Sequence, residues 1–369
     1  MTRLGDVCAI RYGKDHKKLS DGSVPTYGSG GIMRYVDTAI CEQPSVLIPR
    51  KGTLGNLFYT DEPFWTVDTL FWTDIDQTKI VPKYLYYQLK QKDLASYNVG
   101  TAVPSLTVEV LNEIDLDVPS IDKQRRIVEV LNSFDSKIAL NNQLNDYLAN
   151  LLDAAFANSA KSGSKEFGLP EVVDILSGGT PRTKNAEYWE DGRIPFFTPG
   201  DVTNSVYTLT TEKHITDVGL DNCNSELYPV DTVFLTARGT VGKVAIAGRP
   251  MAMNQSCFAF RGKSIPQSVV FQIIKNAVKT LRAKANGATF AAINTRDLKI
   301  ETVAVPCNKE IAHYDESASK WLDLIRTNEE ENLQLSALRD ILLPKLMSGE
   351  IDVSKVDLTQ LTNNHLADC

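Results

Sequence analysis

The chain has 369 residues, of which 43% are hydrophobic and 23% charged, as is typical of a soluble globular protein with more than one domain. It has no apolar run long enough to span a bilayer, and its first residues lack the basic and apolar regions of a secretory signal. Six cysteines without C-x-x-C spacing and four dispersed histidines argue against a metal site or a disulfide framework, and they predict a cytoplasmic protein.

The net charge of −7 is unevenly distributed along the chain. Residues 165–308 carry 16 basic and 14 acidic side chains, whereas residues 309–369 carry 6 and 12. Most of the acidity therefore lies near the C-terminus. A nucleic-acid partner for the rest of the chain is not excluded by the overall charge.

The chain contains an internal repeat with an offset of 187 residues. "IPRKGTLG" (48–55) matches "LTARGTVG" (235–242), and residues 98–119 match residues 285–306 without a gap. The parts before the glycine-containing segments differ in length, so each copy has a variable front and a more constant back. Two long copies indicate a duplicated domain rather than a solenoid, which needs three or more short repeats.

The predicted elements follow the same order in both copies. Each copy begins with short strands separated by glycine and proline, including "SVLIP" (45–49) and "TVFLT" (232–236). Each then has a helix in the globular part, at 82–94 and at 266–284. The fold class is therefore α+β, with two globular domains at residues 1–121 and 165–308.

A long helix is predicted after each globular domain, at residues 122–160 and 309–349. Apolar residues recur at alternating steps of four and three along both helices, which is the pattern of a coiled coil. Pro344 is expected to disrupt the second helix, and Gly349 to cap it. The small, polar segment 157–170 is predicted to be a linker, and residues 350–369 to be a C-terminal tail.

The seam of the two long helices contains asparagines at matching positions, which cost stability and are used to set register. Antiparallel pairing would place Asn141 opposite Asn332 and Asn145 opposite Asn328. Parallel pairing would place Asn141 opposite Asn328, but it requires a connection that returns along the whole helix. An antiparallel pair relating the two copies by a pseudo-two-fold is therefore predicted.

The two glycine segments do not match a nucleotide-binding loop, because only two residues separate their glycines and no Ser or Thr follows the lysine position. They could be tight turns between strands, or they could bind a nucleic-acid backbone, and the two interpretations are compatible. Glycines let backbone N–H groups approach a phosphate, and neighbouring cations add charge. The candidates for backbone contacts are Arg50, Lys51, Gly52, Thr53, Arg238, Gly239, Thr240 and Lys243.

The sequence contains no G-x-S-x-G, H-E-x-x-H or N-P-P-[YF] motif, so no catalytic site is predicted. Polar and aromatic residues instead gather in the predicted loops, and they differ between the copies. Arg, Asn and Gln read guanine and adenine edges, and Asp accepts from cytosine. The candidates for base contacts are Tyr27, Ser29, Arg34, Asp68, Thr101, Arg182, Lys184, Asn204, Asn254, Gln255 and Arg296.

Two helical segments, "VPSIDKQRRIVEVLNSFDSKIALNNQLNDYL" (118–148) and "LRDILLPKLMSGEI" (338–351), complete a pattern that covers nearly the whole chain. With the order of domains and the repeated glycine segments, they make the chain resemble the specificity (HsdS) subunits of type I restriction-modification systems. The resemblance implies that residues 1–121 and 165–308 are target recognition domains. Each would read one half of a bipartite, asymmetric sequence in double-stranded DNA.

The resemblance also implies the partners. The paired helices would set the spacer between the two half-sites and dock two methyltransferase subunits, which would bind S-adenosylmethionine. This chain itself would bind no cofactor and would be non-catalytic, and restriction (translocase) subunits could join the complex. Two other hypotheses stay open: a structural adaptor built from a duplicated domain without a role on DNA, and an enzyme with a degenerate nucleotide site.

Overall fold

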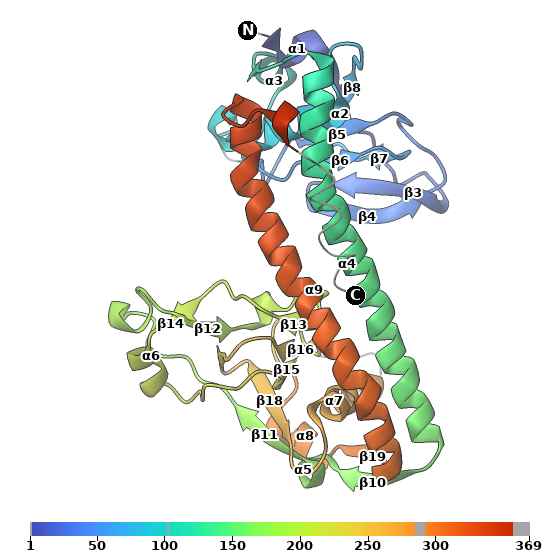
Figure 1. Ribbon diagram of the computed structural model, residues 1–369, viewed down its shortest axis with the longest axis vertical. Helices are drawn as coiled ribbons and strands as arrows, with labels where there is room; N and C mark the ends of the chain where they lie inside the picture. The colour runs from blue at the N-terminus through green and yellow to red at the C-terminus, as the bar shows by residue number, and fades with distance from the viewer. Residues whose placement is uncertain (1, 102, 285–291, 357–369) are drawn as a thin grey trace. The chain divides into compact units, whose positions relative to one another are not determined.

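The computed structural model describes residues 2–101, 103–284 and 292–356. The end of the predicted C-terminal tail, residues 357–369, lies outside the described residues. The chain folds as two compact units, residues 1–136 with 335–369 and residues 137–334. Both boundaries fall inside the long helices, so each unit contains a globular part and a stretch of both helices (Figure 1).

The globular part of the first unit is built on a four-stranded sheet of order β2-β8-β5-β6 and a three-stranded sheet of order β4-β3-β7. Strand β5 is buried at all five positions because it lies inside its sheet and contacts α2. The elements are β1 (Thr2–Arg3), α1 (Leu4–Val7), β2 (Cys8–Tyr12), β3 (Asp21–Gly28), β4 (Gly31–Val36), β5 (Ser45–Pro49), β6 (Phe58–Thr60), β7 (Trp65–Thr66), β8 (Leu70–Ile75), α2 (Pro82–Lys90), the 3₁₀ helix η1 (Leu94–Tyr97), α3 (Val108–Asn112) and β9 (Asp115–Leu116).

The globular part of the second unit has a five-stranded sheet of order β11-β18-β15-β16-β13 and a three-stranded sheet of order β14-β12-β17. Helix α7 contacts strands β15, β16 and β18 of the larger sheet. The elements are β10 (Ser164–Gly168), α5 (Leu169–Val172), β11 (Val173–Ser177), η2 (Ala186–Tyr188), β12 (Ile194–Phe197), η3 (Pro199–Asp201), β13 (Tyr207–Thr208), β14 (His214–Ile215), α6 (Asp217–Asp221), β15 (Val233–Thr236), β16 (Val244–Ala247), β17 (Ala252–Met253), β18 (Cys257–Gly262), α7 (Gln267–Lys284), α8 (Thr295–Ile300) and β19 (Thr302–Pro306).

The structure confirms the duplication. Arg50 N donates to the carbonyl of Thr69 at 2.8 Å, and Ala237 N donates to the carbonyl of Ser256 at the same distance, each position shifted by 187. The variable fronts are also equivalent, although strands β2 and β11 begin at Cys8 and Val173, an offset of only 165. The second copy has acquired its greater length between β11 and β15, where β13 and α6 have no counterpart in the first.

The long helices are α4 (Ile121–Lys161) and α9 (Asn308–Ser348), each within one residue of its predicted start and end. In the second unit, Asn141 Nδ2 donates to Asn332 Oδ1 at 2.9 Å, and Asn328 Nδ2 donates to Asn145 Oδ1 at 2.8 Å. This is the antiparallel register predicted from the sequence, and it excludes the parallel one. In the first unit, Arg339 Nη1 donates to Asp135 Oδ1 at 2.8 Å across the same seam.

Pro344 does not disrupt the second long helix, so that prediction is wrong. Helix α9 continues to Ser348, and it ends before Gly349, whose φ of +78° confirms the predicted glycine cap. Leu343, Leu346 and Met347 are buried in the core of the first unit. Their burial offsets the backbone hydrogen bond that a proline removes from a helix interior.

The predicted linker at 157–170 is also wrong. Helix α4 extends to Lys161, and Gly163 turns the chain at a φ of +138°. Residues Ser164–Gly168 then form β10, which pairs antiparallel with β19 over five residues. A strand whose partner lies about 140 residues later leaves little local signal beyond its small, polar composition. Within the described residues, no helix is long and apolar enough to cross a membrane.

Candidate nucleic-acid interface

The glycine segment of the first copy is a loop, residues 50–57, between the antiparallel strands β5 and β6. Gly52 has a φ of +93°, which a side chain would strain. Its N–H donates to the carbonyl of Pro104 at 3.1 Å. Leu54, only 4% exposed, inserts into the core and anchors the tip of the loop. The loop is therefore a rigid turn, and Lys51, Gly52 and Thr53 are exposed on it.

Arg50 is held against the protein rather than extended into solvent. Its guanidinium Nη1 donates to the carbonyl of Asp68 at 3.2 Å, and its Cζ lies 5.1 Å from the ring centroid of Tyr12. These contacts fix the guanidinium beside the turn that carries Asp68. A predicted backbone contact and a predicted base contact thus lie side by side.

The second glycine loop, residues 237–243, connects β15 and β16 in the same way. Gly239 and Gly242 have φ values of +76° and +78°. The hydroxyl of Thr236 accepts a hydrogen bond from Lys243 N at 3.0 Å, which closes the base of the loop. Arg238, Gly239, Thr240 and Lys243 are exposed or partly exposed around it.

Each glycine loop is joined to the turn that follows the first strand of the smaller sheet. In the first unit, Asn56 Nδ2 donates to the carbonyl of Ser29 at 3.2 Å. In the second unit, Thr240 Oγ1 donates to the carbonyl of Pro199 at 2.9 Å. The side chains differ but the connection is conserved between the copies. We call this joined surface, made of the glycine loop, that turn and the turns at 67–69 and 254–256, the loop face of each unit.

A cavity of about 700 Å³ opens beside the loop face of the first unit. Ser29 and Asp68, both predicted to contact bases, line it. The cavity is also lined by Asp15, His16 and Lys17 from the variable front, which were not among the residues predicted from the sequence. His16 Nδ1 is buried and has no hydrogen-bond partner among the described residues. The only sequence signal for these three is a charged run in a segment that differs between the copies.

Two predicted base contacts of the first unit have other roles in the free protein. The ring centroids of Tyr27 and Phe58 lie 5.9 Å apart, and burial raises the pKa of the Tyr27 hydroxyl. Arg34 pairs with Asp21 at 2.6 Å within the β3–β4 hairpin. Thr101 is exposed in the segment that bonds to Gly52 through Pro104, so it lies on a loop adjoining the loop face.

In the second unit, Asn254 and Gln255 form the turn after β17 and belong to the loop face. Asn254 N donates to the carbonyl of Phe197 at 3.0 Å, as Val67 N does to that of Tyr27 in the first unit. The side chain of Gln255, which is exposed, contacts the hydroxyl of Thr180.

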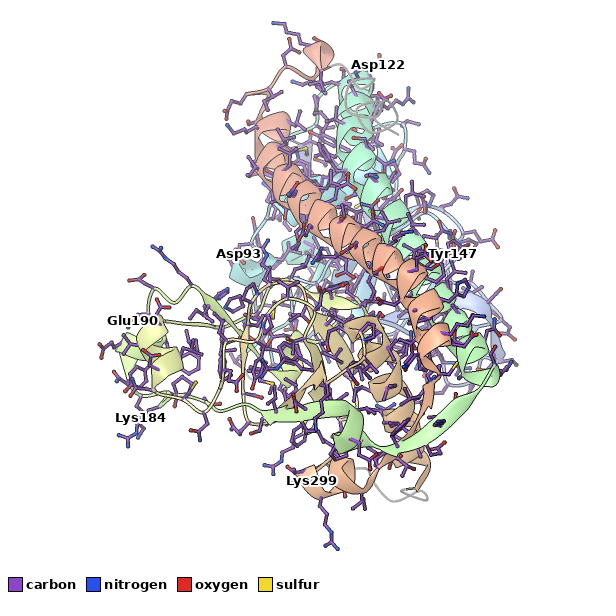
Figure 2. All side chains as sticks on the ribbon, turned by 60° about the horizontal axis from the view of Figure 1, so that its bottom comes forward. Asp93, Asp122, Tyr147, Lys184, Glu190 and Lys299 are labelled. Carbon is purple, nitrogen blue, oxygen red and sulfur yellow. The ribbon has the colours of Figure 1, made fainter. Side chains whose placement is uncertain are left out.

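The other candidates of the second unit are dispersed. Arg182 and Lys184 are exposed on the loop after β11, and Figure 2 shows Lys184 and Glu190 at one edge of the unit. Arg296 is exposed on α8, which contacts α5. Asn204 lines a second cavity together with Lys243. Asn204 was a candidate for base contacts, but it lies in the same cavity lining as Lys243, a candidate for backbone contacts.

Gln124, from the motif "IDKQRRI", has a structural role. It is fully buried, its Oε1 accepts from Val81 N at 2.8 Å, and its Nε2 donates to the carbonyl of Pro119 at 2.8 Å. The side chain thus ties the start of α4 to the start of α2. Its counterpart in the second copy is the apolar Ile311, which is also buried.

Among the described residues, no group of three or more His, Cys, Asp or Glu side chains could hold a metal ion. The buried thiol of Cys257 has a pKa raised to about 12 by burial, so it is no nucleophile at neutral pH. What the loop faces offer is exposed amides, cations and hydroxyls on rigid turns, which suits recognition of a polar polymer.

Comparison with known proteins agrees with this geometry. The family model for the type I restriction modification DNA specificity domain matches residues 1–150 and 161–334. The MjaIX specificity subunit of Methanocaldococcus jannaschii is 30% identical over 172 residues, which are 44% of this chain and 39% of that protein. The HindI specificity subunit of Haemophilus influenzae is 21% identical over 363 residues, covering 74% of this chain and 78% of that protein.

The fold is that of a solved relative. The S subunit of the type I restriction-modification system from M. genitalium superimposes with a TM-score of 0.58 at 17% identity, covering 94% of this chain and 95% of that one. The family model matches well over half of the residues, and it matches both copies of the repeat. The chain belongs to the family of type I restriction-modification DNA specificity domains.

Proposed function

We propose that this chain is the DNA-reading subunit of a type I restriction-modification complex, and that each loop face reads one half of a bipartite target. One observation carries the proposal: the same rigid loop face is built twice, and its side chains differ between the copies. Asp68 lies beside the cavity of the first unit, whereas Asn254 and Gln255 form the corresponding turn of the second. Unlike side chains on like scaffolds suit two unlike half-sites.

Within this proposal, the glycine loops position the DNA backbone, and the cavity beside Ser29 and Asp68 contributes to base reading. The chain itself performs no chemistry. S-adenosylmethionine binds to the partner methyltransferase, which modifies the DNA in the cytoplasm, and restriction subunits can join the assembly. The names of the curated relatives as specificity subunits support a role within such a complex.

A domain exchange tests this function. Replacing residues 165–308 with the corresponding domain of another family member should change one half of the modified sequence and leave the other half unaltered. The readout is sequencing of base modifications in cells that carry the gene with its methyltransferase. A reciprocal exchange of residues 1–121 is the matched control and should change the other half only. A continuous motif, a change in both halves, or no modification with the wild-type chain would count against the proposal and favour the adaptor.

Helix α4 offers a surface for the methyltransferase. Four large apolar side chains recur at the spacing of one helix face and are 38–61% exposed, namely Leu140, Leu144, Tyr147 and Leu151. Tyr147 is labelled in Figure 2. This stripe, which we call the α4 stripe, lies on a different face from the buried asparagines. The corresponding positions on α9 are Thr327, Glu331, Gln334 and Leu338. Two methyltransferase subunits would therefore meet unlike helix surfaces.

Placing a charge on the α4 stripe should weaken assembly. We expect Tyr147→Asp to reduce co-purification of the methyltransferase at least tenfold, because burying an unpaired carboxylate in an apolar contact is costly. Ala139→Asp is the control, since Ala139 is exposed on α4 but lies off the stripe. Equal binding by both variants, with unfolding curves like that of the wild type, would show that the stripe is not the docking surface.

A further inference from the structure

A second cavity, of about 400 Å³, lies between helix α7 and the second glycine loop. Four basic residues line it, and no acidic residue is among its lining: Lys243, Lys275, Lys279 and Arg282. The lining also includes the exposed polar segment Thr203–Ser205, which contains Asn204. Lys243 and Asn204 were predicted site residues, whereas the three basic residues of α7 were not predicted from the sequence. Their spacing of four and three, which places them on one helix face, was the available signal.

The four basic side chains differ in their contacts within the protein. Lys275 Nζ pairs with Asp153 Oδ1 at 2.5 Å, and Arg282 Nη2 donates to the carbonyls of Val241 at 2.8 Å and Gly242 at 3.2 Å. Arg282 thereby holds the glycine loop in place. Within the described part of the chain, Lys243 and Lys279 form no ion pair. Two ammonium groups therefore border the cavity without a neutralising carboxylate, an arrangement suited to an anion.

The four basic residues that line this cavity are not repeated as a set in the first copy. At the positions shifted by 187 residues it has Asn56, Gln88, Lys92 and Ala95. Asn56 bonds to the carbonyl of Ser29 instead of presenting a charge, and Gln88 is buried. Of these four positions only Lys92 is basic in the first copy, so the second copy carries more positive charge here. The same asymmetry appears in composition, since residues 165–308 carry more basic than acidic side chains and residues 1–121 carry fewer.

We propose that the basic cavity binds phosphates of the DNA backbone through Lys243 and Lys279, so that the second recognition domain supplies more of the salt-dependent affinity than the first. This inference rests on the proposed DNA-reading function. DNA is the favoured source of the phosphate because Gly242 and Lys243 belong both to the cavity and to the glycine loop of the loop face. The first unit then depends more on direct base contacts.

The test is the salt dependence of DNA binding by the complex assembled with its methyltransferase. Each phosphate contact adds about 0.9 to the magnitude of the slope of log K against log salt concentration. The Lys243→Gln/Lys279→Gln variant should therefore show a slope smaller by about 1 to 2 on both target and unrelated DNA. The control is Lys161→Gln/Lys165→Gln, which removes the same charge from exposed positions of the same unit. Its slope should stay close to that of the wild type.

The outcomes separate this inference from the proposed function. Two results would show that the cavity is not a DNA phosphate site, provided that the wild-type complex modifies a split motif. In the first, the Lys243→Gln/Lys279→Gln variant keeps the wild-type slope of log K against log salt concentration. In the second, this variant and the Lys161→Gln/Lys165→Gln control lose the same amount of slope. Titration of the unassembled chain with inorganic phosphate is a second arm. Binding that is lost in the variant, with no change in DNA slope, would assign the cavity to a free anion and overturn the inference. Failure of the wild-type complex to modify any split motif would instead overturn the function.

Discussion

Replacing Gly13 with alanine should destabilise the first unit by about 3 kcal/mol or more, because the added methyl group has no space. A Cβ atom at Gly13 would lie 2.1 Å from the carbonyl oxygen of Val67. The obstacle is backbone and cannot rotate away. Gly13 N also donates to the carbonyl of Leu70 at 3.1 Å, so the strand end cannot move without losing that bond. The measurement is chemical denaturation followed by fluorescence of the aromatic core.

Gly30→Ala is the matched control, because a Cβ atom there meets nothing within 4 Å. It should be neutral or slightly stabilising, since alanine lowers the entropy of the unfolded chain. Because the domain is duplicated, the same substitution can be tested at the equivalent glycine of the second copy. Gly178, the counterpart of Gly13, would place a Cβ atom 2.3 Å from the carbonyl oxygen of Met253. If the Gly13→Ala and Gly30→Ala variants unfold at the same denaturant concentration, Gly13 does not lie as close to the backbone of Val67 as the structure has it.

Replacing Glu329 with glutamine should stabilise the second unit above pH 7, by at most about 3 kcal/mol, and should have little effect near pH 4. The Glu329 side chain is 7% exposed on α9, and burial raises the pKa of its carboxyl group to about 7 from an ordinary value of 4.5. Backbone N–H groups of Tyr207 and Val206 oppose this shift without cancelling it. Glutamine keeps an oxygen to accept these bonds and carries no charge to desolvate.

The sign follows from linkage. Because the pKa of Glu329 is higher in the folded than in the unfolded state, its contribution to stability is fully present below pH 4.5 and is lost as the pH rises through about 7. Wild-type and variant unfolding free energies should therefore diverge between these values. Glu316→Gln, at an exposed position of the same helix, is the control and should run parallel to the wild type. A constant difference between wild type and Glu329→Gln at every pH would exclude titration of this carboxyl as the cause.

Much of the fold could be predicted because its signals are periodic or repeated. The steps of four and three along α4 and α9 placed Asn141 opposite Asn332 and Asn145 opposite Asn328, as the structure has them. Strands such as β5 and β15 are short apolar runs between turn residues, and both lie where the sequence predicted them. Pro344 shows the limit of such rules, since burial of the neighbouring leucines outweighs the local tendency of proline to end a helix.

The candidate site was only partly accessible from sequence. The glycine loops were recognised because they are repeated, and their φ values show why glycine is needed there. The candidates Tyr27 and Arg34 were chosen by residue type, but packing against Phe58 and pairing with Asp21 occupy their side chains. His16 and Lys279 were missed because a charged run and a helical spacing are weak signals that do not show which cavity each residue borders.

By itself, the amino-acid sequence determined the duplication, the two long helices, their antiparallel register and the membership of a DNA specificity family. These depend on spacing and on residue type within short windows or between equivalent positions. Only the tertiary structure decided that residues 164–168 form a strand with β19, and that the front loops border the first cavity. It also decided that the second glycine loop borders a cavity lined by Lys275, Lys279 and Arg282 of α7. Such features depend on contacts between residues far apart in the chain, and these form only when the hydrophobic cores bring those segments together.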